Sequence, residues 1–310
     1  METQQFDVPV LLITFNRPDN ARKVFESIRR IKPSRLYFFS DAPREGNEDD
    51  LEKVQRTREI LNEVDWPCTI HTKFEQLNLG CGPGPYSAIS WVFDQEDRAI
   101  ILEDDCLPHD SFFSFCKTML EKYQHDPRIM HIAGTRWNEE YYIGDYDFFY
   151  SSIGHIWGWA TWRRAWKFYD YFMRSWNKKR DWRLLNSKLK SRIQTQFWVD
   201  NFNHTFVHNP QLKHAWDYQW QYTLFKNNGL AIVPNVNLIS NIGVQGIHAN
   251  EEAGDKSSFN RLVSGWKYRG MQSESITASD DFDQYHIDRY FMRNVKPFRK
   301  MKLLIKSFIY

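Results

Sequence analysis

The chain is poor in the features that mark secreted, membrane-spanning and nucleic-acid-binding proteins. Its four cysteines, Cys68, Cys81, Cys106 and Cys116, show no Cys-x-x-Cys spacing, which favours a reducing, cytoplasmic location over a disulfide framework. No apolar run reaches 18 residues, and the first seven residues are mostly polar with no apolar signal-peptide core, so we expect neither a spanning helix nor a signal peptide. The formal net charge of +2 gives no general electrostatic basis for binding nucleic acid.

What the chain has in quantity is aromatic residues. Its 310 residues include 13 Trp, 15 Tyr and 23 Phe, within an ordinary globular composition of 42% hydrophobic and 26% charged residues. The length is sufficient for one large α/β unit or two smaller lobes with a sizeable core. Most of the aromatic side chains are expected in that core, while others can stack against flat apolar faces such as sugar rings and bases.

Strand and helix patterns alternate along the first 135 residues. The expected strands and helices, in order, are 8–14 (strand), 18–31 (helix), 36–40 (strand), a helix that ends near 64, 68–74 (strand), 86–94 (helix), a strand that ends at 103, 111–123 (helix) and 129–132 (strand). Repeated βα units of this kind predict an α/β fold with a mostly parallel central sheet flanked by helices.

The pattern changes after residue 135. An irregular aromatic tract over 137–159 precedes helical patterns at 161–172 and 181–207, and a last strand at 231–234. There is no internal repeat and no low-complexity linker. We therefore expect a first lobe over 1–135, a second lobe of the same unit over 136–250, and a basic, aromatic extension over 251–310.

Three consecutive carboxylates follow an apolar run in the first lobe. Residues 100–102 (Ile-Ile-Leu) predict a strand buried on both faces, which carries Glu103, Asp104 and Asp105 to its carboxyl end. Ligands bind beyond such strand ends in open α/β sheets. Because adjacent carboxylates repel one another, one is expected to meet a cation, and oxygen ligands suit Mg²⁺ or Mn²⁺ with a bound diphosphate. The alternative is an acidic strand-to-helix turn, since Asp110 precedes a helical pattern.

An ordered series of short segments resembles glycosyltransferases of the GT-A fold, specifically the inverting N-acetylglucosaminyltransferase I type. The segments are 10–17 (Val-Leu-Leu-Ile-Thr-Phe-Asn-Arg), 39–41 (Phe-Ser-Asp), 101–105 (Ile-Leu-Glu-Asp-Asp) with Phe112 and Phe113 behind it, 158–159 (Gly-Trp), 216–217 (Trp-Asp) and 246–248 (Gly-Ile-His). The resemblance covers residues 8–249. The chain departs from the family at Tyr218, where the family carries a second acid, and in a Gly- and Pro-rich loop over 80–85.

The resemblance implies a GT-A (Rossmann-like) sheet with an acceptor-side lobe, and a metal-dependent inverting transfer of GlcNAc or another hexose. The donor would be a UDP-sugar and the acceptor a glycan or lipid-linked glycan. Asp105 would bind Mn²⁺ or Mg²⁺, Asp104 a ribose hydroxyl, and Glu103 the donor sugar or nucleotide. Arg17 would reach the nucleotide by charge-assisted hydrogen bonds, and Asp41 would accept from the uracil ring. For Arg17, a surface charge beside a helix is the alternative.

Two more residues complete the predicted site. Asp217 is the candidate general base, because flanking Trp216 and Trp220 should raise its pKa, and a base opposite the leaving group would invert the anomeric centre. The alternative is that Asp217 caps the following helix. His248 ends a glycine-containing loop that resembles a lid and would contact the diphosphate or metal on closure. Its alternative is a solvated loop histidine.

Two further predictions concern partners. Trp137, Trp157 and Trp159 are candidates for an acceptor platform, although core packing is the safer interpretation for at least two of them. Residues 289–310 interleave Lys and Arg with apolar residues and contain no acid. This pattern is typical of a surface for anionic lipid, which would place the protein peripherally on the inner face of the membrane. A solvated tail or an oligomer contact is the alternative.

Two other functions remain open from the sequence. A nucleotidyltransferase that makes sugar nucleotides needs a glycine-rich phosphate loop after the first strand, but residues 14–18 contain no glycine. A non-catalytic glycan-binding module would use the tryptophans without needing Asp105 and Asp217 together.

Overall fold

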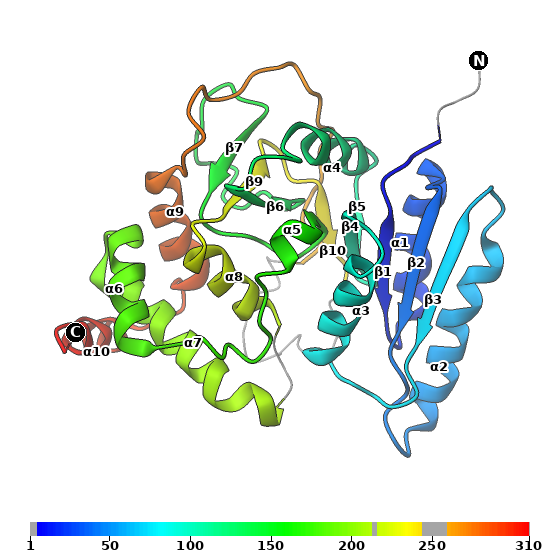
Figure 1. Ribbon diagram of the computed structural model, residues 1–310, viewed down its shortest axis with the longest axis horizontal. Coiled ribbons are helices and arrows are strands. Elements are labelled where there is room, and N and C mark those ends of the chain that lie inside the picture. The colour runs from blue at the N-terminus through cyan, green and yellow to red at the C-terminus, as the bar shows by residue number, and fades with distance from the viewer. Residues whose placement is uncertain (1–4, 213–215, 244–258, 310) are drawn as a thin grey trace.

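The computed structural model describes residues 5–212, 216–243 and 259–309. An eight-stranded sheet runs through the molecule in the order β3-β2-β1-β4-β8-β6-β9-β7 (Figure 1). Its strands are β1 (Val10–Thr14), β2 (Arg35–Ser40), β3 (Thr69–Phe74), β4 (Arg98–Glu103), β6 (Ile129–Ala133), β7 (Phe148–Ser151), β8 (Trp159–Trp162) and β9 (Leu230–Pro234). Only β7 and β8 oppose their neighbours in this sheet. The predicted α/β fold with a mostly parallel central sheet is therefore confirmed.

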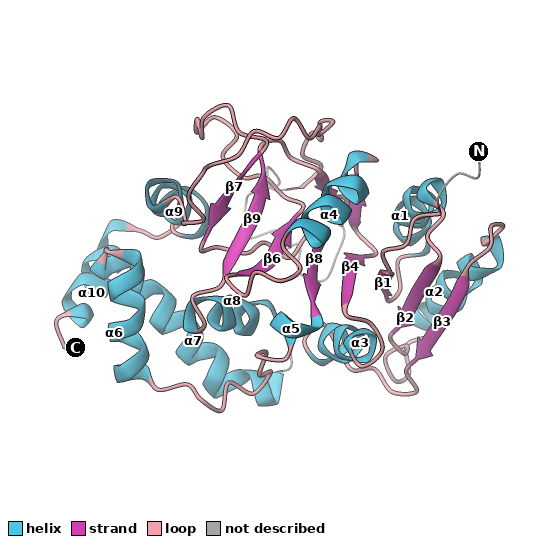
Figure 2. Ribbon diagram, turned by 45° about the horizontal axis from the view of Figure 1, so that its top comes forward, coloured by secondary structure: helices cyan, strands magenta, loops and turns pink. Residues whose placement is uncertain are grey.

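Helices cover both faces of the sheet and form a separate group at one end (Figure 2). The helices are α1 (Pro18–Ile31), α2 (Glu48–Glu59), α3 (Pro83–Phe93), α4 (Ser111–Lys122), α5 (Arg163–Trp166), α6 (Lys178–Leu189), α7 (Arg192–Leu212), α8 (Asp217–Lys226), α9 (Asp280–His286) and α10 (Pro297–Ser307), with a 3₁₀ turn at Ile60–Glu63 and a π-helical turn at Ile287–Phe291.

Strand β1 divides the apolar core into two layers because its side chains alternate between the faces of the sheet. Val10 and Leu12 pack with Phe25 of α1 and with helix α4. Leu11 and Ile13 pack on the opposite face with helices α3, α5 and α8. All five residues of β1 are buried, which is the pattern expected of a central strand in a doubly covered sheet.

Helix α1 shows how closely local sequence can determine an element. Pro18 occupies its first turn, where a missing N–H costs nothing. Its buried face includes Ala21, Val24 and Ile28 at helical spacing. The helix ends at Lys32, which takes a left-handed conformation and donates its N–H to Ile28 O and Arg29 O. The predicted and observed bounds of this helix agree.

The prediction of helices over 161–172 and 181–207 is wrong in detail. Residues 159–162 instead form β8, which pairs with both β4 and β6, and α5 contains only Arg163–Trp166. The second predicted helix is divided at Lys190, which adopts φ +54° and ends α6. Most of the apolar side chains of α6 and α7 then pack into a third core with Leu303 of α10.

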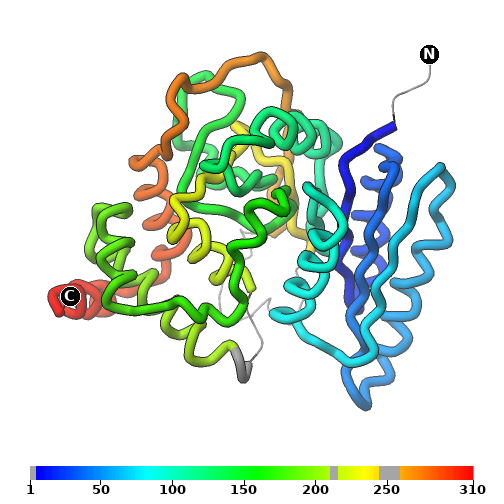
Figure 3. The backbone as a smooth tube through the Cα atoms, in the orientation of Figure 1, coloured from blue at the N-terminus to red at the C-terminus, as the bar shows by residue number. Residues whose placement is uncertain are grey.

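The chain after residue 259 returns to the body of the fold. In Figure 3 it passes beside α4 before reaching α9 and α10. Trp266 packs edge-on against Phe115 of α4, with ring centroids 4.9 Å apart, and its Nε1 donates to Asp147 O. The predicted division into lobes and an extension stays a prediction, while the sheet itself is continuous between residues of both predicted lobes.

Candidate functional site

Charged side chains gather where β1, β2 and β4 end. These strands are parallel neighbours, so their carboxyl ends meet at one edge of the sheet. Arg17 follows β1, Asp41 follows β2, and Glu103 is the last residue of β4. Asp104 and Asp105 occupy the turn between β4 and the short strand β5 (Cys106–Pro108). The fold thus brings together residues that the sequence places up to 88 positions apart.

Arg17 joins the two aspartates of this turn. Its Nη1 lies 3.2 Å from Asp104 Oδ1 and 2.8 Å from Asp105 Oδ2. Asp104 also accepts the backbone N–H of Phe15 at 3.1 Å. Burial raises the pKa of Asp104 to about 6, although Arg17 acts in the opposite direction. Burial would lower the pKa of Arg17, but Asp104 and Asp105 raise it above its usual value. The surface-charge alternative for Arg17 is therefore wrong.

Asp105 is enclosed by a second strand pair. Strand β10 (Ile239–Asn241) runs antiparallel to β5, and Asn241 Nδ2 lies 3.3 Å from Asp105 Oδ1. After β10 the backbone passes so close to Asp105 that a Cβ on Gly243 would lie 2.4 Å from Asp105 Oδ2. Glycine is needed here because any larger residue would displace this carboxylate.

Glu103 is the least satisfied acid of the three. Its Oε1 is buried and has no hydrogen-bond partner. Burial, followed by the charges of Asp105 and Asp104, raises the pKa of Glu103 to about 8. An unpaired buried oxygen is costly, so the site is suited to a ligand or ion that supplies a hydroxyl or positive charge at this point.

Asp41 organises a loop at the same edge. Its carboxylate accepts the backbone N–H groups of Ala42, Leu79 and Gly80 at 2.8 to 2.9 Å. Its pKa is nevertheless raised, chiefly by burial. Asp41 therefore holds the predicted Gly- and Pro-rich loop against β2, and its contact with a uracil ring stays a prediction. Cys81, in the same loop, is exposed and close enough to Glu103 for electrostatic interaction.

Asp217 approaches the acidic turn from the other half of the chain. It is the first residue of α8, whose N-cap is Trp216, so the interpretation of Asp217 as the N-cap is wrong. Its charge helps to raise the pKa of Glu103, and also that of Tyr218, which burial chiefly raises to about 12. Trp216 and Trp220 are buried and pack on Trp159. The predicted role of Asp217 as a base stays a prediction.

An aromatic group near Asp217 combines Trp137 and Trp157, which the sequence singled out, with Tyr290, which it did not. Tyr290 lies 4.3 Å from the ring of Trp137 and 5.4 Å from that of His155, between centroids. The charge of Asp217 acts on Tyr290 as well as on Glu103. Trp157 is half-buried beside Trp137, whereas Trp159 is fully buried, as core packing requires.

Two buried N–H donors in this group have no partner. They are Trp137 Nε1 and Arg261 Nη1, and the Arg261 guanidinium lies 4.3 Å above the Trp137 ring. Arg261 Nη2 donates to Arg136 O at 2.6 Å. The sequence singled out Trp137 and Trp157 of this group but gave no signal for Tyr290, which comes from a segment about 70 residues beyond Asp217.

A divalent cation fits the acidic turn chemically. Among the described residues, no three His, Cys, Asp or Glu side chains form a metal-binding cluster. Mg²⁺ is commonly held by only one or two carboxylates together with substrate phosphates, and the carboxylate of Asp105 at the strand end suits this arrangement. The predicted ligand His248, with the lid after residue 243, lies outside the described residues.

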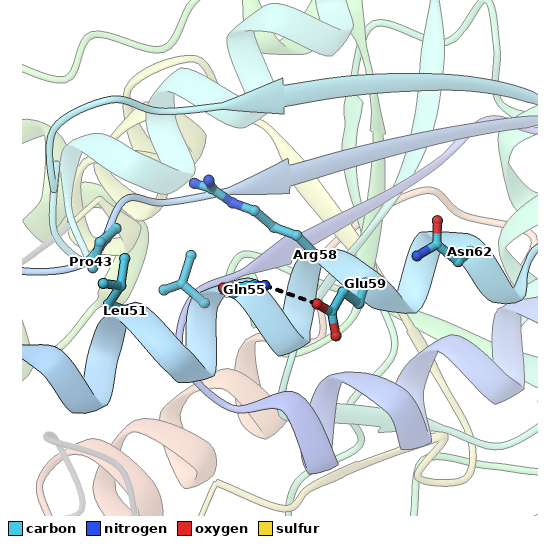
Figure 4. A pocket seen from close by; sticks show the side chains of 7 residues that line it. Pro43, Leu51, Gln55, Arg58, Glu59 and Asn62 are labelled. Carbon is cyan, nitrogen blue, oxygen red and sulfur yellow. Dashed lines mark hydrogen bonds between the residues drawn. The ribbon is translucent and has the colours of Figure 1, made fainter.

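A groove of about 360 Å³ lies elsewhere, along α2 (Figure 4). It is lined by Pro43, Leu51, Val54, Gln55, Arg58, Glu59 and Asn62. Within it, Gln55 Nε2 donates to Glu59 Oε1 at 3.2 Å. Arg58 extends from the groove and donates to Ser40 Oγ at 3.0 Å. None of the predicted catalytic or binding residues lines this groove.

Comparisons with known proteins place the chain in no family. No protein-family model matches it, and neither does any curated protein. Similar solved structures include a 4-diphosphocytidyl-2C-methyl-D-erythritol synthase from Anaerococcus prevotii, at 8% identity and a TM-score of 0.30, covering 51% of this chain and 72% of that one. They also include a UDP-glucose pyrophosphorylase complexed with UDP-glucose, at 11% identity and a TM-score of 0.27, covering 42% of this chain and 64% of that one. At these TM-scores the likeness implies no activity. Neither structure supports the resemblance to the N-acetylglucosaminyltransferase I type, which stays a prediction.

Proposed function

We propose that the chain is a metal-dependent, inverting glycosyltransferase that moves a sugar, GlcNAc or another hexose, from a UDP-sugar to a glycan or lipid-linked glycan. The observation that carries the proposal is an acidic turn at one sheet edge with a further acid within electrostatic reach of it. Arg17 holds Asp104 and Asp105 together, and Asp217 lies within electrostatic reach of Glu103. Ligands bind at such strand ends in open α/β sheets.

The first chemical requirement is to stabilise charge on the departing nucleoside diphosphate. Asp105 would hold Mn²⁺ or Mg²⁺, which acts as a Lewis acid on the diphosphate when bound. Arg17, now on Asp105 Oδ2, would turn to the phosphates and donate charge-assisted hydrogen bonds. Asp104 stays fixed by Phe15 N and would accept a ribose hydroxyl. Glu103 would accept a hydroxyl of the donor sugar at its orphaned Oε1.

The second requirement is to activate the acceptor. Asp217 would take the proton of the acceptor hydroxyl as that oxygen bonds to the anomeric carbon and the bond to the diphosphate breaks. Attack from the side opposite the leaving group inverts the anomeric centre. A positioned base of this kind contributes about 10² to 10⁴ in rate. Asp217 lies within electrostatic reach of both Glu103 and Tyr290, which supports this role.

The aromatic group beyond Asp217 supports a saccharide acceptor. Trp157 is half-buried and its ring lies 5.4 Å from that of buried Trp137, between centroids. Sugar rings stack on partly exposed indole rings such as that of Trp157. The unpartnered donors Trp137 Nε1 and Arg261 Nη1 would gain acceptors from glycan oxygens. Trp159 takes no part because it is buried against Trp216 and Trp220.

The second candidate is nucleotidyl transfer, in which a nucleoside triphosphate and a sugar phosphate give a sugar nucleotide and pyrophosphate. The names of the two similar structures, a UDP-glucose pyrophosphorylase and a diphosphocytidyl-methylerythritol synthase, point to nucleotide chemistry of this kind. Their TM-scores of 0.30 and 0.27 give those names no weight for this chain. A divalent ion at Asp105 would serve either reaction, so the products must distinguish them.

The deciding experiment compares products. The protein is incubated with Mn²⁺ and a panel of UDP-sugars, with UDP release measured, and separately with UTP and sugar 1-phosphates, with pyrophosphate release measured. The proposal predicts UDP release that Asp105→Asn abolishes and that Asp217→Asn lowers by about 10² to 10⁴. The anomeric configuration of the product, read by NMR, should be inverted.

The matched control is Asp110→Asn. Asp110 lies five positions after Asp105, on the surface, and pairs with Arg30 rather than with the site. Its variant should keep full activity. Pyrophosphate release that depends on Asp105, without UDP release, would replace the proposal with the second candidate. Sugar binding that survives both Asp105→Asn and Asp217→Asn, without turnover, would indicate a glycan-binding module.

A further inference from the structure

Helix α10 turns its apolar side outward. Leu303 and Ser307 are its buried residues, and both face the body of the protein. The large apolar residues on the rest of the segment are exposed: Phe298, Met301, Leu304, Ile305, Phe308 and Ile309. Phe298, Ile305 and Phe308 keep 63%, 62% and 69% of their surface exposed. A helix that served only the core would show the reverse arrangement.

The exposed apolar residues form one continuous stripe. Positions 298, 301, 305 and 308 are separated by three or four residues, and at 100° per residue they fall on one face of the helix. Leu304 lies at the border of this stripe. The stripe is therefore wide enough to bury against a flat apolar phase along the whole helix. Single exposed apolar residues are normal on protein surfaces, but contiguous ones mark an interaction site.

Cations flank the stripe. Residues 289–310 contain no acid and seven basic residues: Arg289, Arg293, Lys296, Arg299, Lys300, Lys302 and Lys306. At helical spacing, Lys302, Lys306 and Arg299 lie along one border of the stripe and Lys300 lies beyond the other. Lys306 is paired with Asp200 at 2.9 Å. The remaining charge lies beside the apolar side chains, which is the arrangement of interfacial amphipathic helices.

Helix α10 is held firmly in this orientation. Arg192 at the start of α7 donates to Ser307 O and, at 3.3 Å, to Ser307 Oγ. The Arg192 guanidinium is placed between the rings of Trp182 of α6 and Phe308, 4.9 and 4.8 Å from their centroids. In Figures 1 and 2, α10 lies beside α6 at the end of the molecule away from β1, β2 and β3. The stripe is thus preformed and needs no folding on contact.

We propose that α10 docks the protein on an anionic lipid surface, lying in the plane of the interface with its apolar stripe among the acyl chains. No helix in the described part of the chain is long and apolar enough to span a bilayer, so the contact is peripheral. Basic side chains near an anionic membrane strengthen such a contact by electrostatic attraction. The inference does not depend on the reaction proposed above.

The charge decides between a membrane and a second copy of the chain. A symmetric contact through α10 would bring the basic borders of two copies face to face, and like charges across an interface are destabilising. An anionic surface is complementary to the same borders.

The test is flotation of the intact protein with vesicles. Phosphatidylcholine vesicles containing phosphatidylglycerol should carry the protein, vesicles of phosphatidylcholine alone should carry much less, and added salt should release it. Phe298→Ser with Ile305→Ser, and separately Arg299→Gln with Lys302→Gln, should each lower the partition coefficient about tenfold or more.

The matched control is Leu51→Ser. Leu51 lies on α2 and is 59% exposed, close to the value for Ile305, so it tests the loss of an exposed apolar residue far from α10. It should float as the unaltered protein does, and circular dichroism should show all variants folded. Failure to float with anionic vesicles, or equal flotation of the Phe298→Ser/Ile305→Ser variant, would overturn the proposal. Dimers that this variant dissociates, without any vesicle binding, would replace the membrane with a second copy.

Discussion

The position of the Asp105 carboxylate depends on the neighbouring glycine, Gly243. Gly243 brings its backbone so close to the Asp105 carboxylate that there is no room for a Cβ. Arg17 fixes the same oxygen from the other side at 2.8 Å. The carboxylate is thus held between a cation and a backbone segment that follows β10, and this precision matters because small displacements of catalytic groups are costly in rate.

Gly243→Ala should therefore impair the site without unfolding the protein. The new Cβ would lie 2.4 Å from Asp105 Oδ2 and push the carboxylate aside, so turnover should fall about 10²-fold. The control is Gly265→Ala, whose Cβ would meet only His109 at 3.5 Å. Steady-state kinetics and thermal melting test both variants. Unchanged turnover in Gly243→Ala would show that the exact position of Asp105 is unimportant.

Three buried histidines form another residue-scale feature. His131 accepts the Trp220 Nε1–H at 3.0 Å and lies 3.0 Å from His155 O through its Nε2. His155 and His286 join through their Nε2 atoms at 2.6 Å, so one of them donates and the other accepts. Burial lowers the pKa of His131 and of His286 to about 3, and burial also lowers that of His155 well below 6.5. All three rings are therefore neutral in the folded protein at neutral pH.

The low pKa values of these three histidines predict that the stability they contribute is lost in acid. Between pH 6.5 and about 3 the three histidines bind protons in the unfolded chain but not in the folded one, so the stability that they contribute falls as the pH decreases. At pH 5 the loss should reach about 2 kcal/mol for each histidine. Urea unfolding at several pH values measures it. His286→Gln should remove about one proton from the slope, whereas His125→Gln should not. An unchanged slope in His286→Gln would contradict the account.

At the scale of elements, one arginine joins three segments. Arg164 of α5 donates to Tyr123 O, Gln124 O and Ile129 O at 2.8 to 2.9 Å, and its guanidinium lies 4.2 Å from the Trp162 ring. These carbonyls belong to the end of α4 and the start of β6. Arg164 thus fixes the connection between a helix on one face of the sheet and a central strand.

Arg164→Lys should destabilise the fold by about 2 kcal/mol, because lysine cannot donate to three carbonyls in one plane. Arg163→Lys provides the neighbouring control. Arg163 is more exposed and pairs with Asp97, so its replacement should cost less than about 0.5 kcal/mol. Urea denaturation of both variants measures the difference. Equal stabilities would show that these hydrogen bonds contribute no net stability.

Elements were predictable where local sequence determines them. Helix α1 has Pro18 in its first turn and a clean apolar face, and its bounds follow from these signals. The helical pattern over 161–172 begins inside β8, where pairing with β4 and β6 overrides local preference. The end of α6 at Lys190 was hidden because a lysine, not a glycine, takes the left-handed conformation.

The residues of the candidate site also divide into those that could be predicted from local sequence and those that could not. Glu103, Asp104 and Asp105 follow an apolar run, so their place at a strand end could be read from the sequence. The approach of Arg17 to Asp105 depends on the parallel pairing of β1 with β4, which no local pattern contains. Tyr290 was missed because it comes from a π-helical turn far along the chain, and only tertiary packing brings it near Asp217.

At the scale of the whole molecule, the two halves of the chain share one sheet. β8, which follows the predicted boundary near residue 135, pairs with β4 and β6, which both precede it. The segment after residue 259 is tied back by Arg269, whose Nε donates to Asp147 Oδ1 at 2.7 Å. A division near residue 135 would cut through the pairing of β8 with β4 and β6.

The protein should therefore unfold in one cooperative step. Tryptophan fluorescence and far-ultraviolet circular dichroism should give the same urea midpoint, since a continuous core couples all elements. Addition of UDP and Mn²⁺ should move both midpoints together if they bind the folded state. Two separate midpoints would show that the halves are independent folding units.

The most direct test of the central claim is calorimetric titration of UDP into the protein, with Mn²⁺ and with a chelator. Asp105 is the residue assigned to the ion, so binding should require Mn²⁺ and should be lost in Asp105→Asn while Asp110→Asn retains it. Equal affinity for UDP in Mn²⁺ and in chelator, or full Mn²⁺-dependent binding by Asp105→Asn, would contradict the account.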